Sequence, residues 1–207
     1  MRGTVIAVWS AGAGRSFALL LCCRTARRGP WLATKGNVMS DISVRVLGEN
    51  EWEQYKEFRL RALRESPNAF VADVETEEEY DEDLWRARMN RSSRLMIDKA
   101  GEPVGIVSVR SSESLFENAA ELFGLWVVPD LRGEGIAAAL VVSASEVAEK
   151  TGASQLVYWV GTDNARGVAF ASSYGFRPTE HRREPRTDEA RDAGIEEEIA
   201  MVLALRR

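Results

Sequence analysis

The sequence is short of the residues from which many active sites and metal sites are built. Its 207 residues include one histidine, His181, and two cysteines, which are adjacent at positions 22 and 23. Residues 39–207 therefore contain no cysteine, which excludes a disulfide framework and a Cys–His catalytic pair there. The single histidine excludes a histidine-rich metal site. Scarce, unpaired cysteine is typical of a reducing compartment, so we expect a cytoplasmic protein that binds no metal.

Long apolar runs and excess positive charge are missing as well. The apolar run Phe17–Leu21 is far shorter than the roughly 20 residues that cross a membrane. The chain has a formal net charge of −5, and residues 39–207 hold 21 basic against 32 acidic side chains. Nucleic-acid binding depends on neutralising phosphates, so this balance opposes it. We expect neither a membrane nor a nucleic acid as a partner.

Residues 1–38 differ in composition from the rest of the chain. They carry six basic side chains and no acidic one. We interpret them as a disordered tail, or as a stretch that precedes a true start at Met39. The remaining residues, 39–207, are numerous enough for one domain with a full hydrophobic core.

The most informative stretch runs from Glu121 to Lys150. Glu121–Val128 is almost continuously apolar, as in a strand that is buried on both faces, and Pro129 ends it. Apolar residues then recur at helical spacing, and Gly152 is placed to end the helix. The turn between strand and helix, Arg132–Ala137, presents free backbone N–H groups at the positive end of that helix. This arrangement predicts a phosphate-binding site.

Hydrophobic periodicity predicts the other elements. Strands are expected at Ser43–Leu47, Leu95–Ile97, Val104–Val109, Gln155–Val160 and Glu198–Leu205. Helices are expected over residues 52–63 and 164–174, and another from its N-cap Thr76 to Arg88. The polar segment His181–Gly194 is expected to be a hairpin loop.

The motif and the order of elements resemble those of the GCN5-related N-acetyltransferases (GNAT). Arg132-x-x-Gly135-x-Ala137 matches the acyl-CoA signature of that family, and Asn164 and Gly175-Phe176 follow downstream. The resemblance covers Ser43 to Leu205. It implies an α/β fold with a twisted, mostly antiparallel sheet of six or seven strands, flanked by about four helices. In such a fold the fourth and fifth strands separate to form the cofactor cleft.

The resemblance implies that acetyl-CoA binds in this cleft. Backbone groups of the fourth strand would bind the pantetheine arm, and the N–H groups of the turn would hold the pyrophosphate. The cofactor-binding residues implied in this way are Trp126, Val127, Val128, Arg132, Gly133, Glu134, Gly135, Ile136, Ala137, Asn164 and Phe170.

The implied activity is transfer of an acetyl group to a primary amine of a small molecule or a protein. Direct attack by the amine fits a domain without cysteine, and Glu121 is the candidate general base. Many family members have a tyrosine as general acid where this chain has Ala171, and Tyr174 is a weak substitute. The missing tyrosine keeps a non-catalytic acyl-CoA-binding module open as the alternative. A monomer and a homodimer are both compatible with the sequence.

Acidic residues concentrate near the predicted helix that begins at Thr76. They are Glu75, Glu77, Glu78, Glu79, Asp81, Glu82 and Asp83. In the family this region lines the acceptor site, so the acids can attract a cationic amine. They can equally form a solvated helix face with a favourable charge at its N-terminus.

Overall fold

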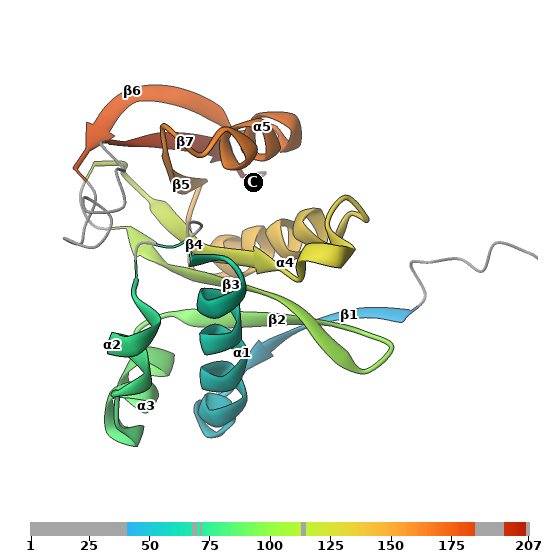
Figure 1. Ribbon diagram of the computed structural model, residues 1–207. Coiled ribbons are helices and arrows are strands. Elements are labelled where there is room, and N and C mark those ends of the chain that lie inside the picture. The colour runs from blue at the N-terminus through green and yellow to red at the C-terminus, as the bar shows by residue number, and fades with distance from the viewer. Residues whose placement is uncertain (1–40, 68–69, 71, 113–114, 185–196, 206–207) are drawn as a thin grey trace, which may run out of the picture. The chain divides into compact units, whose positions relative to one another are not determined.

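The computed structural model describes residues 41–67, 70, 72–112, 115–184 and 197–205 (Figure 1). The two possibilities offered for residues 1–38 fall outside this part of the chain. In chain order the elements are β1 (Ile42–Leu47), η2 (Glu49–Glu51), α1 (Trp52–Glu65), α2 (Val74–Glu78), α3 (Glu82–Asn90), β2 (Ser93–Lys99), β3 (Glu102–Ser112), β4 (Ala119–Val127), η4 (Pro129–Leu131), α4 (Ile136–Lys150), β5 (Gln155–Gly161), α5 (Ala165–Tyr174), β6 (Arg177–Arg183) and β7 (Glu198–Ala204).

The strands form one mixed sheet in the order β1-β2-β3-β4-β5-β7-β6. Neighbouring strands run antiparallel except β4 and β5, which are parallel. The predicted α/β fold with a mostly antiparallel sheet of six or seven strands is confirmed. Five α-helices are found in the described residues, where about four were expected. None of these described helices is long and apolar enough to cross a membrane.

The two faces of the sheet pack against different helices. On β2, Leu95 and Ile97 belong to the hydrophobic cluster that includes α4, whereas Met96 between them belongs to the cluster of α1 and α3. This alternation follows from the two-residue period of a strand. Helices α1, α2 and α3 lie together (Figure 1), and they cover the face that carries the candidate site.

The prediction of one helix from Thr76 to Arg88 is wrong, because two short helices, α2 and α3, occupy this region. The Asp73 carboxylate caps α2 by accepting a hydrogen bond from the Thr76 N–H at 2.9 Å. Asp81 caps α3 in the same way, accepting from the Leu84 N–H at 2.8 Å. Thr76 is therefore inside α2 rather than at its N-cap, and Asp73 and Asp81 supply the two N-caps.

The predicted loop His181–Gly194 also needs a correction at its start. Strand β6 continues to Arg183 and pairs with β7, with Arg183 opposite Glu198. His181 therefore lies in a strand rather than in a loop. Residues 185–196 of the predicted loop lie outside the described residues.

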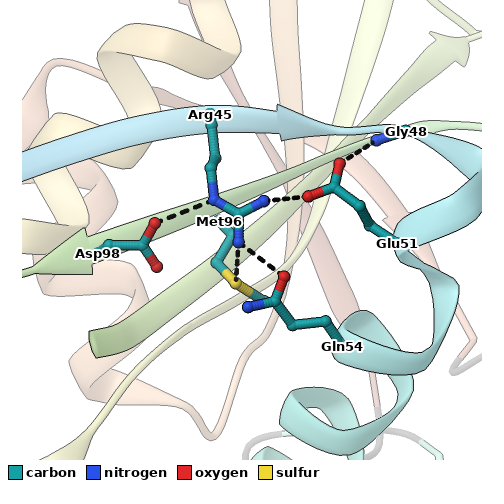
Figure 2. Close-up of polar contacts among 6 residues, drawn as sticks. All are labelled: Arg45, Gly48, Glu51, Gln54, Met96 and Asp98. Carbon is teal, nitrogen blue, oxygen red and sulfur yellow. Dashed lines mark hydrogen bonds and ion pairs between the residues drawn. The ribbon is translucent and has the colours of Figure 1, made fainter. Parts of the chain in front are cut away.

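A polar network around Arg45 fixes the start of α1 against the edge of the sheet (Figure 2). From β1, the Arg45 guanidinium donates to Asp98 on β2 at 3.0 Å, to Gln54 of α1 at 2.7 Å, and to Glu51. Glu51 also accepts a hydrogen bond from the Gly48 N–H at 2.7 Å. Helix α1 is thus anchored by charged groups at its beginning, which positions the side chains that it directs at the candidate site.

Candidate active site

Strands β4 and β5 separate partway along their length. They pair from Ala119 opposite Gln155 to Leu122 opposite Tyr158, and no further pairing is found between them. At this point β4 also bulges away from β3. Gly124 adopts a φ of +63°, and the β3–β4 register shifts between Ile106 and Ser108. The bulge re-aims β4 where the strands part, as the predicted cleft requires.

The turn before α4 has the features of an anion site. Gly133 and Gly135 have φ values of +89° and +85°, a backbone region that favours glycine, and a Cβ on either residue would meet no atom within 4 Å. Within the described chain, no acceptor is found for the backbone N–H groups of residues 133–138. N–H groups without acceptors at the positive end of a helix suit an incoming phosphate.

Two side chains of the turn have protein partners. The Arg132 guanidinium donates to the Val127 carbonyl and to the Ser66 hydroxyl, both at 3.0 Å. Its backbone N–H donates to the Pro129 carbonyl, so this one N–H of the predicted set is already used. Glu134 forms an ion pair with Lys99 at 2.6 Å. Both side chains brace the turn against neighbouring elements and leave its backbone open.

The other residues expected to bind cofactor lie around this turn and the strand separation. Trp126 is buried, with its ring edge-on to Phe58 and its indole N–H donating to Ser66 at 3.0 Å. Val127 and Ile136 are buried in the core, and Val128, Ala137 and Phe170 pack against it. Asn164 caps α5 by accepting from the Gly167 N–H at 2.9 Å, and it also lines a cavity.

Two adjoining cavities open on the α1–α3 face of the sheet. The inner cavity, of about 410 Å³, reaches the separated parts of β4 and β5, and the outer one is about 950 Å³. They share eight lining residues: Ala72, Glu77, Arg88, Arg94, Arg110, Glu121, Phe123 and Trp159. These volumes lie in the range of small-molecule sites.

Strand register brings the polar residues of the cavity floor together. Arg94, Ser108 and Phe123 lie opposite one another across β2, β3 and β4. Arg110 and Glu121 form the next such pair on the same face. Residues that lie directly opposite in a sheet project on one side, so the floor is built from several strands far apart in the sequence.

A buried ion-pair group joins the three helices above this floor. Glu77 of α2 is 2% exposed and accepts hydrogen bonds from Arg59 of α1 at 3.1 Å and from Arg88 of α3 at 3.0 Å. Burial alone would raise the pKa of Glu77, but the two guanidinium groups outweigh it and lower that pKa below its ordinary value. Glu77 therefore acts as a charged clamp between α1, α2 and α3.

Glu121 occupies the floor at the centre of a second ion-pair group. Its side chain is buried, and it accepts hydrogen bonds from Arg110 at 2.6 and 2.9 Å. Arg183 lies 3.5 Å from its other oxygen and donates to Glu198 at 2.6 Å. The candidate base thus lines both cavities, and two guanidinium groups orient its carboxyl group.

The acids around α2 and α3 mostly have structural roles. Of the seven, Glu77 lines the described cavities. Glu78 pairs with Arg64 and Glu82 with Arg86, on the exposed surface, and Asp81 caps α3. These contacts favour a solvated helix face over attraction of a cationic amine.

The tyrosines differ in their access to the site. Tyr174 packs beside Phe170 and Phe176, with ring centroids 6.3 and 6.0 Å away, and burial raises its pKa. Tyr158 lines the inner cavity, and burial followed by the nearby Glu198 raises its pKa to about 12. Both hydroxyls are weaker acids than a solvated tyrosine. Among the tryptophans near the site, Trp85 and Trp126 are core and Trp159 lines both cavities.

The sequence did not reveal the arginines of the site. Arg59, Arg88, Arg94, Arg110 and Arg183 come from five elements and converge on the inner cavity. One signal was present in the sequence. Arg94 directly precedes the apolar run Leu95–Ile97, and a charged side chain next to a buried strand is rare unless it has a partner. The glycine within β4 likewise signalled a bulge.

Comparison with known proteins agrees with this geometry. The model of the acetyltransferase (GNAT) family matches residues 53–176. An uncharacterized N-acetyltransferase of Methanocaldococcus jannaschii is 25% identical over 147 residues, which are 70% of this chain and 64% of that protein. The match thus spans less than two thirds of that relative.

Solved structures share the fold. A GNAT acetyltransferase of Streptococcus pneumoniae has a TM-score of 0.64 at 16% identity, over 80% of this chain and 99% of that one. The yncA protein of Salmonella typhimurium, solved with its cofactor acetyl-CoA, has a TM-score of 0.61 at 18% identity, over 81% and 95%. Since the family model covers more than half of the sequence, the chain belongs to the GNAT family of acetyltransferases.

Proposed function

We propose that this protein transfers the acetyl group of acetyl-CoA to a primary amine. The observation that carries the proposal is the junction of β4 and α4. There, a turn with two left-handed glycines, whose N–H groups have no acceptor among the described residues, follows a strand that parts from its neighbour. The acetyl-CoA found with the Salmonella typhimurium protein supports the choice of donor.

The residues present fit this donor. The N–H groups of residues 133–138 would hold the pyrophosphate, and the open edge of β4 from Phe123 to Val127, with Val128 beyond it, would take the pantetheine arm as an added strand does. Asn164 lines the inner cavity, where it could contact this arm. Acetyl-CoA supplies an acetyl group that is activated as a thioester.

Replacing Gly135 tests the turn directly. Gly135→Ala places a Cβ where the phosphate would bind, so we expect the acetyl-CoA dissociation constant to rise by about tenfold or more. Gly152→Ala is the matched control, because Gly152 also has a positive φ, +88°, and open space around it, but it follows the far end of α4. Both variants should lose about 1–2 kcal/mol of stability. Equal acetyl-CoA binding by the two, measured by calorimetric titration, would argue against the turn as the phosphate site.

The chain's own groups prepare the amine for reaction. An ammonium group must lose a proton before its nitrogen can attack, and Glu121 is the carboxylate in the cavity that we assign to accept it, directly or through water. Residues 39–207 contain no cysteine, so the transfer proceeds without an acetyl-cysteine intermediate.

Tyr174 has no part in this scheme. Tyr174→Phe removes a hydroxyl from a ring that packs in an aromatic group, so we expect kcat to remain unchanged. Steady-state kinetics over a range of pH would check this. A fall in kcat of about tenfold, with loss of the alkaline limb, would make the hydroxyl a proton donor.

The second candidate is a non-catalytic module that binds acyl-CoA. It is favoured by Ala171, which is fully buried where many family members carry an acidic hydroxyl, and by the raised pKa of Tyr158. Free thiol released from acetyl-CoA, measured with a panel of amines, separates the two. Release that depends on an amine supports the enzyme, whereas acetyl-CoA binding without release on any amine supports the module.

A further inference from the structure

Arg94 is a charged side chain buried in the floor of both cavities. It is 5% exposed, and its guanidinium carbon lies over the rings of Tyr55 and Phe123, 4.9 and 5.2 Å from their centroids. These are cation–π contacts. It lines the inner and the outer cavity alike.

The hydrogen bonds of Arg94 leave part of its guanidinium unused. Nη1 donates to the Ser108 hydroxyl at 2.6 Å, and Nη2 donates to the Arg88 carbonyl at 3.0 Å. Its buried Nε has no partner among the described residues. A guanidinium has five N–H donors, so Nη1 and Nη2 each keep a second N–H that these bonds do not use, whereas Nε is shielded from solvent.

No carboxylate of the described chain forms an ion pair with Arg94. The other buried arginine, Arg59, is paired with Glu77, and the half-buried Arg88, Arg110 and Arg183 are also paired. Burial lowers the pKa of Arg94, with further lowering from Arg88 and Arg59. A buried cation of this kind is costly unless an anion compensates it.

The charge of the residues that line the cavities also favours binding of an anion. Among the described residues, six arginines and four acids line them, although the whole chain has a net charge of −5. These residues are Arg59, Arg88, Arg91, Arg94, Arg110, Arg183, Glu77, Glu121, Asp163 and Glu198. A positive cavity in an acidic protein attracts anions.

We infer that the acceptor carries an oxyanion, a carboxylate or a phosphate, which pairs with the guanidinium of Arg94, so that the substrate is a small amine bearing an acid group. The acid group anchors the molecule against β2 and β3, and its amine extends towards Glu121 on β4. The inference rests on the proposed acetyl transfer in calling this molecule the acceptor.

The Arg88 carbonyl gives Arg94 a structural role as well. This carbonyl belongs to the last turn of α3, where a cation is favourable. That contact and the bond to Ser108 use two donors and do not use Nε. Both partners are uncharged, so these two bonds leave the buried charge of Arg94 without a compensating anion.

Matched acceptors test the inference on the unaltered protein. Each of the common amino acids is compared with its own amide, and O-phosphoethanolamine with ethanolamine, by release of CoA thiol. The amide keeps the amine and loses the charge, and its amine is the more readily deprotonated, so any bias from amine protonation favours the amide. We expect at least one acid to have a kcat/KM about tenfold or more above that of its neutral partner. Which pair shows the effect distinguishes carboxylate from phosphate.

Variants then assign the preference to Arg94. Arg94→Met should remove the preference for the acid, because kcat/KM should fall by about tenfold or more with the acid and by less with its neutral partner. Arg94→Lys should restore part of it, and Arg91→Met, which removes an exposed charge from the outer cavity, should leave it intact. If Arg94→Met does not fold, the inference is still tested by the acid preference of the wild type and by its partial loss in Arg94→Lys.

Failure of the inference and failure of the proposed function look different. Acetylation of neutral amines or polyamines at rates equal to or above those of the acids would overturn the inference alone. If acetyl-CoA binds but no amine releases CoA, the proposed function fails. In that case a rise in melting temperature with the acids and not with their neutral partners would still support the anion site, and equal shifts would overturn it.

Discussion

Glu121→Gln is expected to lower kcat by about 100-fold or more at neutral pH. A positioned general base contributes roughly 10²–10⁴-fold, and glutamine keeps the size and the hydrogen-bonding geometry of glutamate without its basicity. The deficit should be greatest near pH 6 and shrink towards pH 9, because more of the amine is then already neutral in solution. Steady-state rates across this range provide the measurement.

Glu198→Gln is the matched control for this loss. Glu198 is also buried in the site and pairs with Arg183, the same arginine that contacts Glu121. Its replacement disturbs the ion-pair group but removes no base, so we expect a smaller loss and an unaltered pH profile. If Glu121→Gln behaves in the same way, Glu121 orients Arg110 and Arg183 and does not accept the proton.

Glu77→Gln is expected to destabilise the protein by about 3 kcal/mol at pH 7. Removing one partner of a buried ion pair leaves the others uncompensated, and here two guanidinium groups lose their carboxylate at once. Urea unfolding measures the change. Glu78→Gln is the neighbouring control, because Glu78 and its partner Arg64 are exposed and such pairs contribute about 0–1 kcal/mol.

The effect of Glu77 should depend on pH in a fixed direction. The folded-state pKa of Glu77 lies below its ordinary value of 4.5, so its stabilisation is full above pH 4.5 and is lost as the pH falls through the folded-state pKa. The stability difference between wild type and Glu77→Gln should therefore be constant between pH 6 and 7 and diminish below 4.5. A difference that grows on acidification would contradict the ion-pair clamp.

The strand–turn–helix at the centre of the fold could be predicted because its signals are local. A buried strand ended by Pro129, glycines in the turn and an amphipathic helix occur in one continuous stretch. The structure places α4 from Ile136 to Lys150, and Gly133 and Gly135 both have positive φ. Each backbone feature here, such as a positive φ or a helix end, is favoured by the residue at that position. It could therefore be predicted without knowledge of distant contacts.

The acceptor side could not be predicted because it depends on register and on distant packing. Arg94 reaches the cavity because β2 pairs with β3 and β3 with β4 in one particular register. In the sequence, Glu77 cannot be distinguished from the other acids around α2. Its buried ion pairs with Arg59 and Arg88 exist only when α1, α2 and α3 pack together. The break into α2 and α3 was missed because Asp73 and Asp81, rather than Thr76, supply the caps.

The most direct test of the proposed donor site is a calorimetric comparison of acetyl-CoA with acetyl-pantetheine. Acetyl-pantetheine keeps the thioester and the arm that would follow β4 but lacks the 3′-phosphorylated ADP part of acetyl-CoA, including the pyrophosphate that residues 133–138 would hold. At least two charge-assisted hydrogen bonds would be lost, so we expect acetyl-pantetheine to bind about 100-fold more weakly than acetyl-CoA. Equal affinities for the two compounds, or no binding of acetyl-CoA, would contradict the assignment of this turn.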